Sequence, residues 1–495
     1  MWGGNRVADA DAGAPAGLVR PDRNVLLWIA ALLAASGAAV SALGVMGGDK
    51  PETVLPLALA LGGLGAAMAM TRFGLFVMLM LVLRSSLDVT KLTPGDAAPT
   101  ESAWLSSRVM TPSTLVAGLF LLAAALWLLA QTRAGQLRAV SGRGWAWLAF
   151  AAAGFLSMLG SASPFHSLVA AAQVLSIALM YLVLEQLMTD AHTRNRLLTA
   201  VYLSALAPVL YTLAGIAVGH PAGQVKDGFF RIAGTFTQTN DFGRYLMLLI
   251  LFGLAVHRHV ARPWRGWLAA LLVVCGVLML LTMTLTAILG TVLGILVLAT
   301  WHSKRALVVL AVAAVAALAL TPQVVARVQS VTSTTSYYAT GHHANSLSWR
   351  LSYWGEVLPL ANGDPITGIG LDMTGLSTEQ QKQPHNDFLR AYVEEGLIGE
   401  VAYLLLLGSM VAVAIRATRA TPRGSLDRAI GVGFLACTVA IIAGSTSDNV
   451  FTNVAVMWYL VVFGAAANAV GQRARRRMFM EAASTYPGPT SAPVR

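Results

Sequence analysis

The residues best suited to chemistry form a short polar run late in the chain. Residues 384–387 have the sequence Pro-His-Asn-Asp and precede a helical pattern that ends at Gly396. Histidine is the side chain most easily held as a general base near neutral pH. We therefore expect His385 to accept a proton and Asn386 to orient it. Asn386 or Asp387 would cap the helix, and His385, Leu389 and Tyr392 would share one of its faces.

Arginines in other polar segments are candidates to bind phosphate, because the guanidinium group offers a planar fork of donors that matches phosphate oxygens. Arg231 lies in a polar segment that ends at Asn240, and Arg244 lies one turn into the span that follows. An arginine within a span is costly and is a functional candidate by default. Arg350, on a predicted amphipathic helix, is a third candidate for the same phosphate cluster.

An earlier pair, Arg84 and Asp88, is spaced four residues apart and predicts an ion pair that clamps the end of a span. His342 and His343 are adjacent but have no further residues at metal-ligand spacing. The sequence contains no Gly-rich phosphate loop, Ser/His/Asp pattern or Cys-x-x-Cys pair. We therefore predict neither a metal ion nor a cofactor.

The composition indicates the elements that must position these residues. The chain is 56% hydrophobic and 12% charged, whereas soluble domains carry about 25% charged residues. We predict an all-α, polytopic transmembrane helix bundle with about 12–14 spans. The predicted spans begin near Val25, Val54, Phe73, Ser113, Trp145, Ser167, Leu197, Phe242, Trp267, Ala287, Ala306, Leu397, Ile430 and Val454.

The distribution of charge argues against a nucleic-acid partner, although the net charge is +11. The basic residues concentrate in alternate loops, as the positive-inside rule expects for a protein in a lipid bilayer. This alternation predicts that both termini face the cytoplasm. It also predicts that His385, Arg231 and Arg84 lie in loops on the opposite side.

The chain divides into five predicted segments. The outer loop from Thr321 to Glu395 is by far the longest, and long loops are usually functional or disordered. Within it, Leu347, Leu351, Trp354 and Leu358 recur at helical spacing, which predicts an amphipathic helix on the membrane surface or across the bundle. The predicted segments are a disordered tail (1–23), a first transmembrane part (24–320), a large catalytic loop (321–396), a second transmembrane part (397–471) and a basic tail (472–495).

These residues resemble the signature blocks of the O-antigen ligase and polymerase superfamily. His385-Asn386, followed by Gly396-x-x-Gly399, resembles the ligase signature of the large periplasmic loop. Residues 231–240 resemble a second block with Arg, Gly, Phe and Asn, and residues 84–88 resemble an early block of weaker specificity. One departure is that Leu285 stands where many members carry an arginine.

The resemblance implies transfer of a glycan from undecaprenyl diphosphate to a hydroxyl of lipid A–core or a similar acceptor. The reaction would take place on the outer face of the bacterial inner membrane, with inversion at the anomeric carbon and without a metal. The missing arginine keeps a second interpretation open, that of a polymerase joining lipid-linked repeat units. Protein O-glycosylation is a further alternative. A lipid-linked glycan transporter is another, but it should show related halves or charge near the midplane.

Overall fold

Helices dominate the computed structural model, which describes residues 63–87, 112–226, 229–301, 325–326, 346–451 and 453–485. The α-helices are α3 (Phe73–Arg84), α5 (Pro112–Arg133), α6 (Gly142–Leu156), α7 (Pro164–Leu187), α8 (Ala191–Ser204), α9 (Leu206–Ala217), α10 (Thr239–Val256), α11 (Arg262–Leu281), α12 (Leu285–Trp301), α15 (Ser346–Val357), α16 (Thr374–Ser377), α17 (Asp387–Arg419), α18 (Leu426–Ser445) and α19 (Val454–Thr485). Short 3-10 helices are η2 (Ser157–Gly160), η3 (His257–His259) and η4 (Leu358–Asn362), and strands β1 (Gly223–Lys226) and β2 (Phe229–Ile232) pair antiparallel.

The prediction of an all-α polytopic membrane protein is confirmed. In the described part of the chain, eight segments are long and apolar enough to cross a membrane, and α3 and α12 are shorter apolar helices. Three predicted spans, near Val25, Val54 and Ala306, begin outside the described residues. The eight spans are Val116–Arg133, Pro164–Leu187, Ala191–Ala217, Thr239–His259, Arg262–Leu281, Asp387–Arg419, Leu426–Ser445 and Val454–Glu481.

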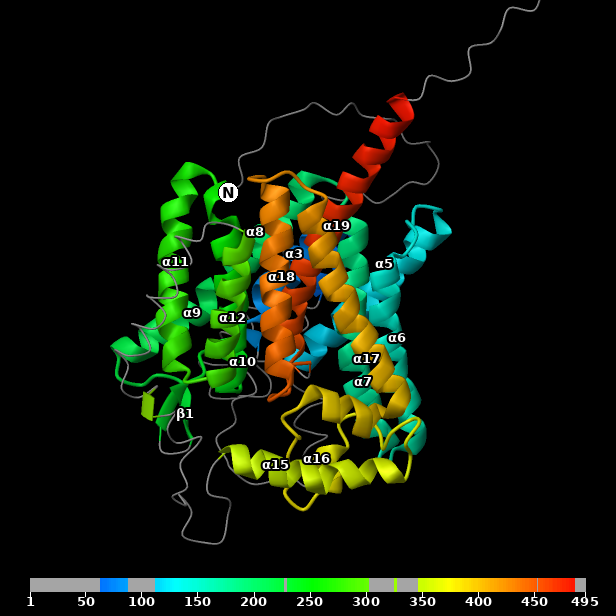
Figure 1. The fold of residues 1–495 in the computed structure, drawn as a ribbon, viewed down its shortest axis with the longest axis vertical. Helices are drawn as coiled ribbons and strands as arrows, with labels where there is room; N and C mark the ends of the chain where they lie inside the picture. The colour runs from blue at the N-terminus through cyan, green and yellow to red at the C-terminus, as the bar shows by residue number, and fades with distance from the viewer. Residues whose placement is uncertain are drawn as a thin grey trace, which may run out of the picture.

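Helices α10 and α19 form the centre of the bundle, with α11 and α5 at its two edges (Figure 1). In α10, 89% of the span is buried, whereas in α5 only 11% is buried. The rings of Phe252 on α10 and Phe463 on α19 stack with centroids 3.9 Å apart. The exposed side chains of Val273 and Val277 on α11 are apolar. Apolar residues on both the buried and the exposed faces are expected where lipid replaces water.

Small residues let the neighbouring helices approach α10 closely. A Cβ at Gly294 of α12 would lie 2.4 Å from Leu251, and one at Gly433 of α18 would lie 2.9 Å from the Cβ of Ala255. Because lipid removes most of the hydrophobic drive between helices, close van der Waals packing of this kind holds membrane bundles together. Helices α10, α12 and α18 therefore pack closely against one another, which fixes the positions of the loops at their ends.

The loops form contacts with one another at each of the two ends of the bundle. At one end, the predicted outer segments meet: Thr235 Oγ1 donates to the Ser85 carbonyl oxygen (2.6 Å), and Ser161 contacts Ser167 next to Gly370. At the other end, Arg194 forms an ion pair with Asp427 (2.7 Å). The grouping of the loops agrees with the alternating topology predicted from charge.

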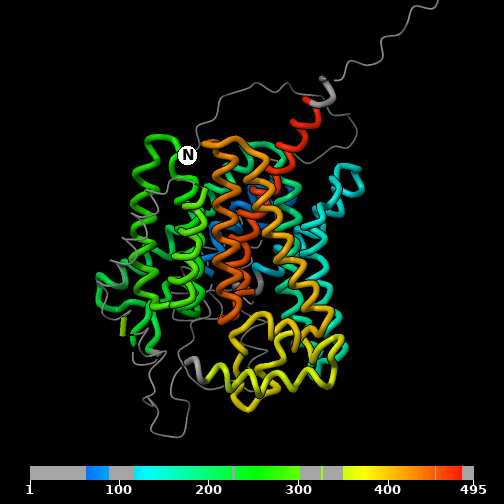
Figure 2. The backbone as a smooth tube through the Cα atoms, viewed as in Figure 1, coloured from blue at the N-terminus to red at the C-terminus, as the bar shows by residue number. Residues whose placement is uncertain are grey.

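The predicted amphipathic helix is α15, which lies across the first of these ends together with α16 (Figures 1 and 2). A different face of this helix packs against the bundle. The buried side chains are Tyr353 and Val357, which pack against Val393 of α17, whereas Leu351 and Leu358 are 56% and 51% exposed. The aromatic ring of Tyr353 and the short branched Val357 fit against α17, so the leucines face outward.

Helix α17 contains a kink that separates its first turns from its membrane part. Gly396 has φ of +67°, and a Cβ there would lie 2.3 Å from the Ile366 backbone. The kink frees amide groups that bond to the loop: Leu397 N donates to Pro365 O (2.9 Å). Gly399 also sits in a tight contact, since its Cβ would lie 2.1 Å from that of Glu395. Glycine permits both the conformation and the close approach.

Candidate functional site

His385 immediately precedes the N-cap of α17. Its φ is +51°, which is uncommon for residues other than glycine, although histidine and asparagine tolerate it better than most. The Asn386 side-chain oxygen accepts hydrogen bonds from Phe388 N (3.0 Å) and Leu389 N (3.2 Å), so Asn386 caps the helix. The prediction that His385 shares a helical face with Leu389 and Tyr392 is wrong, because His385 lies outside the helix.

Asp448, in the short connection between α18 and α19, is the centre of the polar cluster. Its Oδ1 lies 3.2 Å from His385 Nδ1 and accepts from Asn449 N (2.9 Å). Its Oδ2 accepts from Arg244 Nη2 (3.0 Å), Asn240 Nδ2 (3.2 Å) and Thr286 Oγ1 (3.3 Å). One carboxylate therefore binds groups from four separate segments of the chain.

The charge state of Asp448 determines the tautomer of His385. Burial would raise the pKa of the Asp448 carboxyl, but the charge of Arg244 and the hydrogen bond from His385 hold that pKa well below its usual range. The carboxylate is therefore ionised and can only accept hydrogen bonds. It follows that His385 carries its proton on Nδ1 and donates it to Asp448. In the neutral ring Nε2 is then the atom that can accept a proton, and the side chain is 22% exposed.

Arg231, on β2, is buried against the turn between α11 and α12. Its Nε donates to Thr282 O (2.8 Å), and its Nη2 donates to Asn240 Oδ1 (2.7 Å) and Thr284 Oγ1 (3.1 Å). These three hydrogen bonds fix the plane of the guanidinium group. The turn directly precedes Leu285.

Arg244 has a different environment, although it is buried nearby on α10. It forms ion pairs with Asp448 (3.0 Å) and Asp241 (3.4 Å), and its Nη1 donates to Asn449 O (2.8 Å). Two carboxylates thus compensate its charge. A buried arginine with such partners stabilises the arrangement of the carboxylates rather than offering an uncompensated charge to a ligand.

Asn240 links the two halves of the cluster. Its side-chain oxygen accepts from Arg231, and its side-chain nitrogen donates to Asp448. A continuous chain of hydrogen bonds therefore runs from His385 through Asp448 and Asn240 to Arg231. The structure brings together four residues that the sequence singled out, namely His385, Arg231, Arg244 and Asn240.

Helix α15 borders the exposed side of His385. The Trp349 ring meets the His385 ring edge-on, with centroids 5.8 Å apart, and stacks on Tyr353 at 5.1 Å. The ammonium group of Lys382 lies 5.0 Å from the centre of the Trp349 ring. Arg350 is on the same helix, one residue after Trp349, and is half-buried.

The remaining predicted site residues make no described contact with the Asp448 cluster or lie outside the described residues. Arg84 is buried at the end of α3, and the next residue, Ser85, accepts a hydrogen bond from Thr235 in the Arg231 segment. Asp88, the predicted partner of Arg84, lies outside the described residues, as do His342 and His343. Within the part of the chain that the structure describes, no group of three or more His, Cys, Asp or Glu side chains could hold a metal ion.

Sequence reasoning missed Asp448 and the threonines that bind Arg231. Asp448 lies in the connection Thr446–Asn453, between two strongly apolar helices, where a buried acidic residue is unusual. That signal was present in the sequence. Thr282 gave no comparable signal, because its contribution is a backbone carbonyl oxygen, which any residue can provide.

Comparison with known proteins supports the resemblance. Residues 270–404 match the family model described as O-antigen ligase. The matched segment contains the turn at Thr282, helix α15 and the His385 run, and it ends just beyond the kink of α17. No curated protein matches the chain.

Proposed function

We propose that this membrane protein, a member of the O-antigen ligase superfamily, transfers a glycan from undecaprenyl diphosphate to a hydroxyl acceptor. The observation that carries the proposal is the hydrogen-bonded chain from His385 through Asp448 and Asn240 to Arg231. It joins His385 and the buried guanidinium group of Arg231 in one cluster at one end of the bundle. These are the two groups that this transfer requires.

The reaction is a displacement at the anomeric carbon. The acceptor oxygen forms a bond to that carbon while the bond from the carbon to the diphosphate oxygen breaks, and the electron pair leaves with the diphosphate. His385 Nε2 takes the proton of the acceptor hydroxyl, and the ionised Asp448 stabilises the imidazolium that results. A single displacement of this kind inverts the anomeric centre.

Arg231 stabilises the negative charge that develops on the departing diphosphate. Its guanidinium group is held in position by three hydrogen bonds, so little reorganisation is needed during the reaction. Because it is buried, its charge acts through a medium of low dielectric constant. It also lies against the turn before Leu285 and so supplies positive charge near the position where related proteins carry an arginine.

Arg244 and Asn386 have positioning roles in this proposal. Arg244 holds Asp448, which in turn orients the His385 ring. Asn386 fixes the start of α17 and thereby the backbone at His385. The predicted catalytic loop, residues 321–396, supplies His385, while the bilayer-spanning helices hold the lipid of the donor. The site faces the outer side of the bacterial inner membrane, and both termini face the cytoplasm.

Two acceptors fit this chemistry. A ligase would use lipid A–core or a similar acceptor once, and a polymerase would use the next lipid-linked repeat unit. The leucine at position 285 favours the polymerase, and the His385-Asn386 signature favours the ligase. A transporter is disfavoured because the polar cluster lies at one end of the bundle, whereas transporters bind their substrate near the midplane.

The test is a gel assay of the purified full-length protein with a fluorescent undecaprenyl-diphosphate glycan, with and without lipid A–core. One shifted band that requires lipid A–core indicates a ligase. A ladder of products without it indicates a polymerase. The absence of product under both conditions, from a protein that unfolds cooperatively on heating, would contradict glycan transfer to either acceptor.

A further inference from the structure

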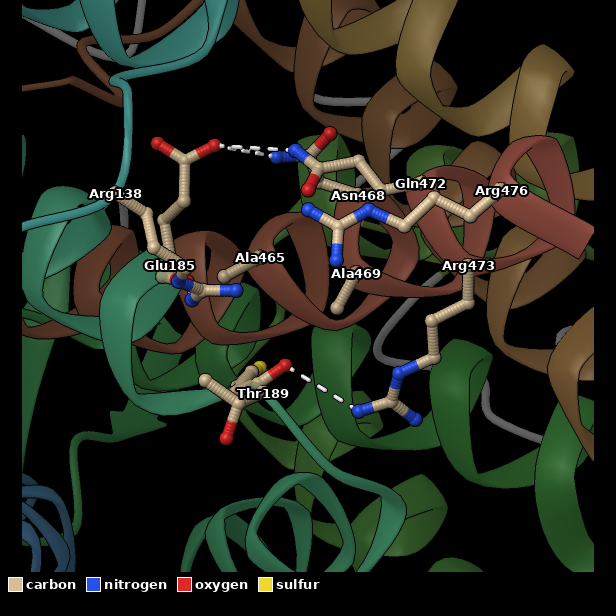
Figure 3. A pocket seen from close by; sticks show the side chains of 10 residues that line it. Arg138, Glu185, Thr189, Ala465, Asn468, Ala469, Gln472, Arg473 and Arg476 are labelled. Carbon is tan, nitrogen blue, oxygen red and sulfur yellow. Dashed lines mark hydrogen bonds between the residues drawn. The ribbon is translucent and has the colours of Figure 1, made fainter. Parts of the chain in front are cut away.

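A basic pocket lies at the end of the bundle opposite His385 (Figure 3). It is formed by the segment before α6, the end of α7 with the residues that follow it, and the middle of α19. Arg476 is 22 residues beyond Val454, the first residue of α19, so at 1.5 Å per residue the two lie roughly 30 Å apart. The polar residues of the pocket are Arg138, Glu185, Thr189, Asn468, Gln472, Arg473 and Arg476.

Positive charge exceeds negative charge in this pocket, where three arginines face one glutamate. Arg138 and Arg476 point toward one another across it (Figure 3). Burial lowers the pKa of Arg138; the charge of Glu185 opposes that shift, and the charge of Arg476 adds to it. Two guanidinium groups that face each other repel, and an anion between them would relieve that repulsion.

Glu185 is turned away from the arginines and is bound by neutral donors. One of its carboxylate oxygens accepts from Asn468 Nδ2 (2.8 Å) and Gln472 Nε2 (3.4 Å), and the other accepts from Ser141 N (3.3 Å). Figure 3 shows this carboxylate pointing toward Asn468 and Gln472. Its hydrogen bonds therefore leave the excess positive charge of the pocket in place.

The donors of the arginines are only partly used. Arg138 Nη2 donates to the carbonyl oxygens of Glu185 and Gln186, and Arg473 Nη2 donates to Met188 O (3.4 Å). These bonds position both guanidinium groups on backbone carbonyls, which are neutral. Arg476 is exposed at the rim.

Part of the pocket lining is apolar. Met188, Ala465 and Ala469 line it beside the arginines. Guanidinium groups next to small apolar side chains, at the end of membrane-spanning helices, suit a phosphate that carries an apolar substituent. Basic pockets between transmembrane helices on the cytoplasmic side are typical binding sites for anionic lipid headgroups.

We propose that this pocket binds a phosphate group, carried by an anionic phospholipid or free in solution. The site is separate from the glycan-transfer site and does not depend on its assignment. Arg138 and Arg476 contact the phosphate oxygens, and Arg473 adds charge from α19. A bound phosphate would tie the end of α7 to α19 and so stabilise the pairing of these two helices.

The experiment measures lipid binding to the purified full-length protein in detergent by native mass spectrometry. Phosphatidylglycerol is compared with phosphatidylcholine, and inorganic phosphate is titrated in a separate arm with thermal unfolding as the readout. The variants are Arg476→Gln alone and Arg138→Gln with Arg476→Gln. The matched control is Arg423→Gln, which changes an exposed arginine at the same end but outside the pocket.

We expect phosphatidylglycerol to bind the wild-type protein and Arg423→Gln equally. Arg476→Gln should weaken that binding about fivefold and the double variant about thirtyfold, as expected for one and two arginines at a membrane surface. Stabilisation by inorganic phosphate that requires Arg476 would instead identify free phosphate as the ligand. Equal binding and equal stabilisation in wild type, Arg476→Gln and Arg423→Gln would overturn the proposal. Because Arg476 is exposed, its single variant remains informative even if the double variant does not fold.

Discussion

Nδ1 of His385 lies 3.2 Å from Oδ1 of Asp448, although 63 residues separate them in the chain. The first residue belongs to the segment before α17 and the second to the turn after α18. Because Asp448 is ionised and accepts this hydrogen bond, His385 presents Nε2 as its proton acceptor. Asp448 therefore orients the ring of His385, although the two residues lie in loops that are distant in sequence.

Asp448→Asn should destabilise the protein by about 3–5 kcal/mol at neutral pH, because it breaks a buried ion pair with Arg244. The pKa of Asp448 is depressed in the folded protein. The stability that the ionised Asp448 contributes to the folded protein is therefore fully present above the pKa of an unfolded aspartate, about 3.9, and is lost as the pH falls below that value.

The measurement is thermal unfolding of wild type and Asp448→Asn in detergent, from pH 7 to below about pH 4. The difference between them should be greatest near pH 7 and should shrink below about pH 4. A difference that stays constant with pH would show that the ionisation of Asp448 does not stabilise the fold.

Arg231→Lys should lower kcat by about 10²–10³-fold, the usual cost of removing one preorganised charge-stabilising donor. Lysine keeps the charge but cannot donate from two nitrogens in one plane to Thr282 and Asn240. Steady-state kinetics with the lipid-diphosphate donor would separate kcat from KM.

Arg265→Lys is the matched control for this variant. Arg265, like Arg231, donates from both Nε and Nη2. Its acceptors are the backbone carbonyl oxygens of Val260 and Arg258, and it lies at the start of α11, whereas Arg231 contacts the turn after the end of that helix. This control should keep the wild-type kcat. If Arg231→Lys also kept it, Arg231 would be a structural residue.

Asn386→Ala should cost about 0.5–2 kcal/mol of stability, because it removes the N-cap of α17. Asn386→Asp can accept the same two hydrogen bonds and should keep both the stability and most of the activity. Thermal unfolding and transfer rates of the two variants would be compared. Loss of activity in a fully stable Asn386→Asp protein would instead show that the amide group itself contacts the reactants.

Gly396→Ala should destabilise the protein by at least about 1–2 kcal/mol, since its φ is positive and its Cβ would meet the Ile366 backbone. Gly408→Ala, in the same helix with open space around its Cβ, should be neutral or stabilising by up to about 1 kcal/mol. The melting temperatures of the two variants would be compared. Equal values would mean that the kink at Gly396 does not constrain α17.

Much of the fold was predictable because membrane spans are recognisable as long apolar runs in the sequence. The apolar runs identified α10, α11, α17, α18 and α19, and the alternation of basic loops is consistent with the contacts between loops at each end of the bundle. The face of α15 that packs on α17 was not predicted. Period alone favoured a stripe of leucines, whereas the contact surface on α17 accommodates Tyr353 and Val357.

The candidate site was predictable only in part. His385, Arg231, Arg244 and Asn240 stand out because polar residues beside spans are rare. Their mutual arrangement depends on Asp448, whose five hydrogen-bond donors come from four segments that only the folded bundle brings together. For the same reason, no sequence pattern indicated that Arg244 is paired with two carboxylates or that Arg231 binds the turn at Thr282.

The most direct test of the central claim is the single-turnover rate of glycan transfer by His385→Asn. Asparagine tolerates the positive φ of this position, so the substitution removes the base while retaining the backbone conformation. The proposed mechanism predicts a rate about 10²–10⁴-fold below wild type, with an unchanged melting temperature. A folded His385→Asn protein that transfers glycan at the wild-type rate would contradict the role of His385 as the base.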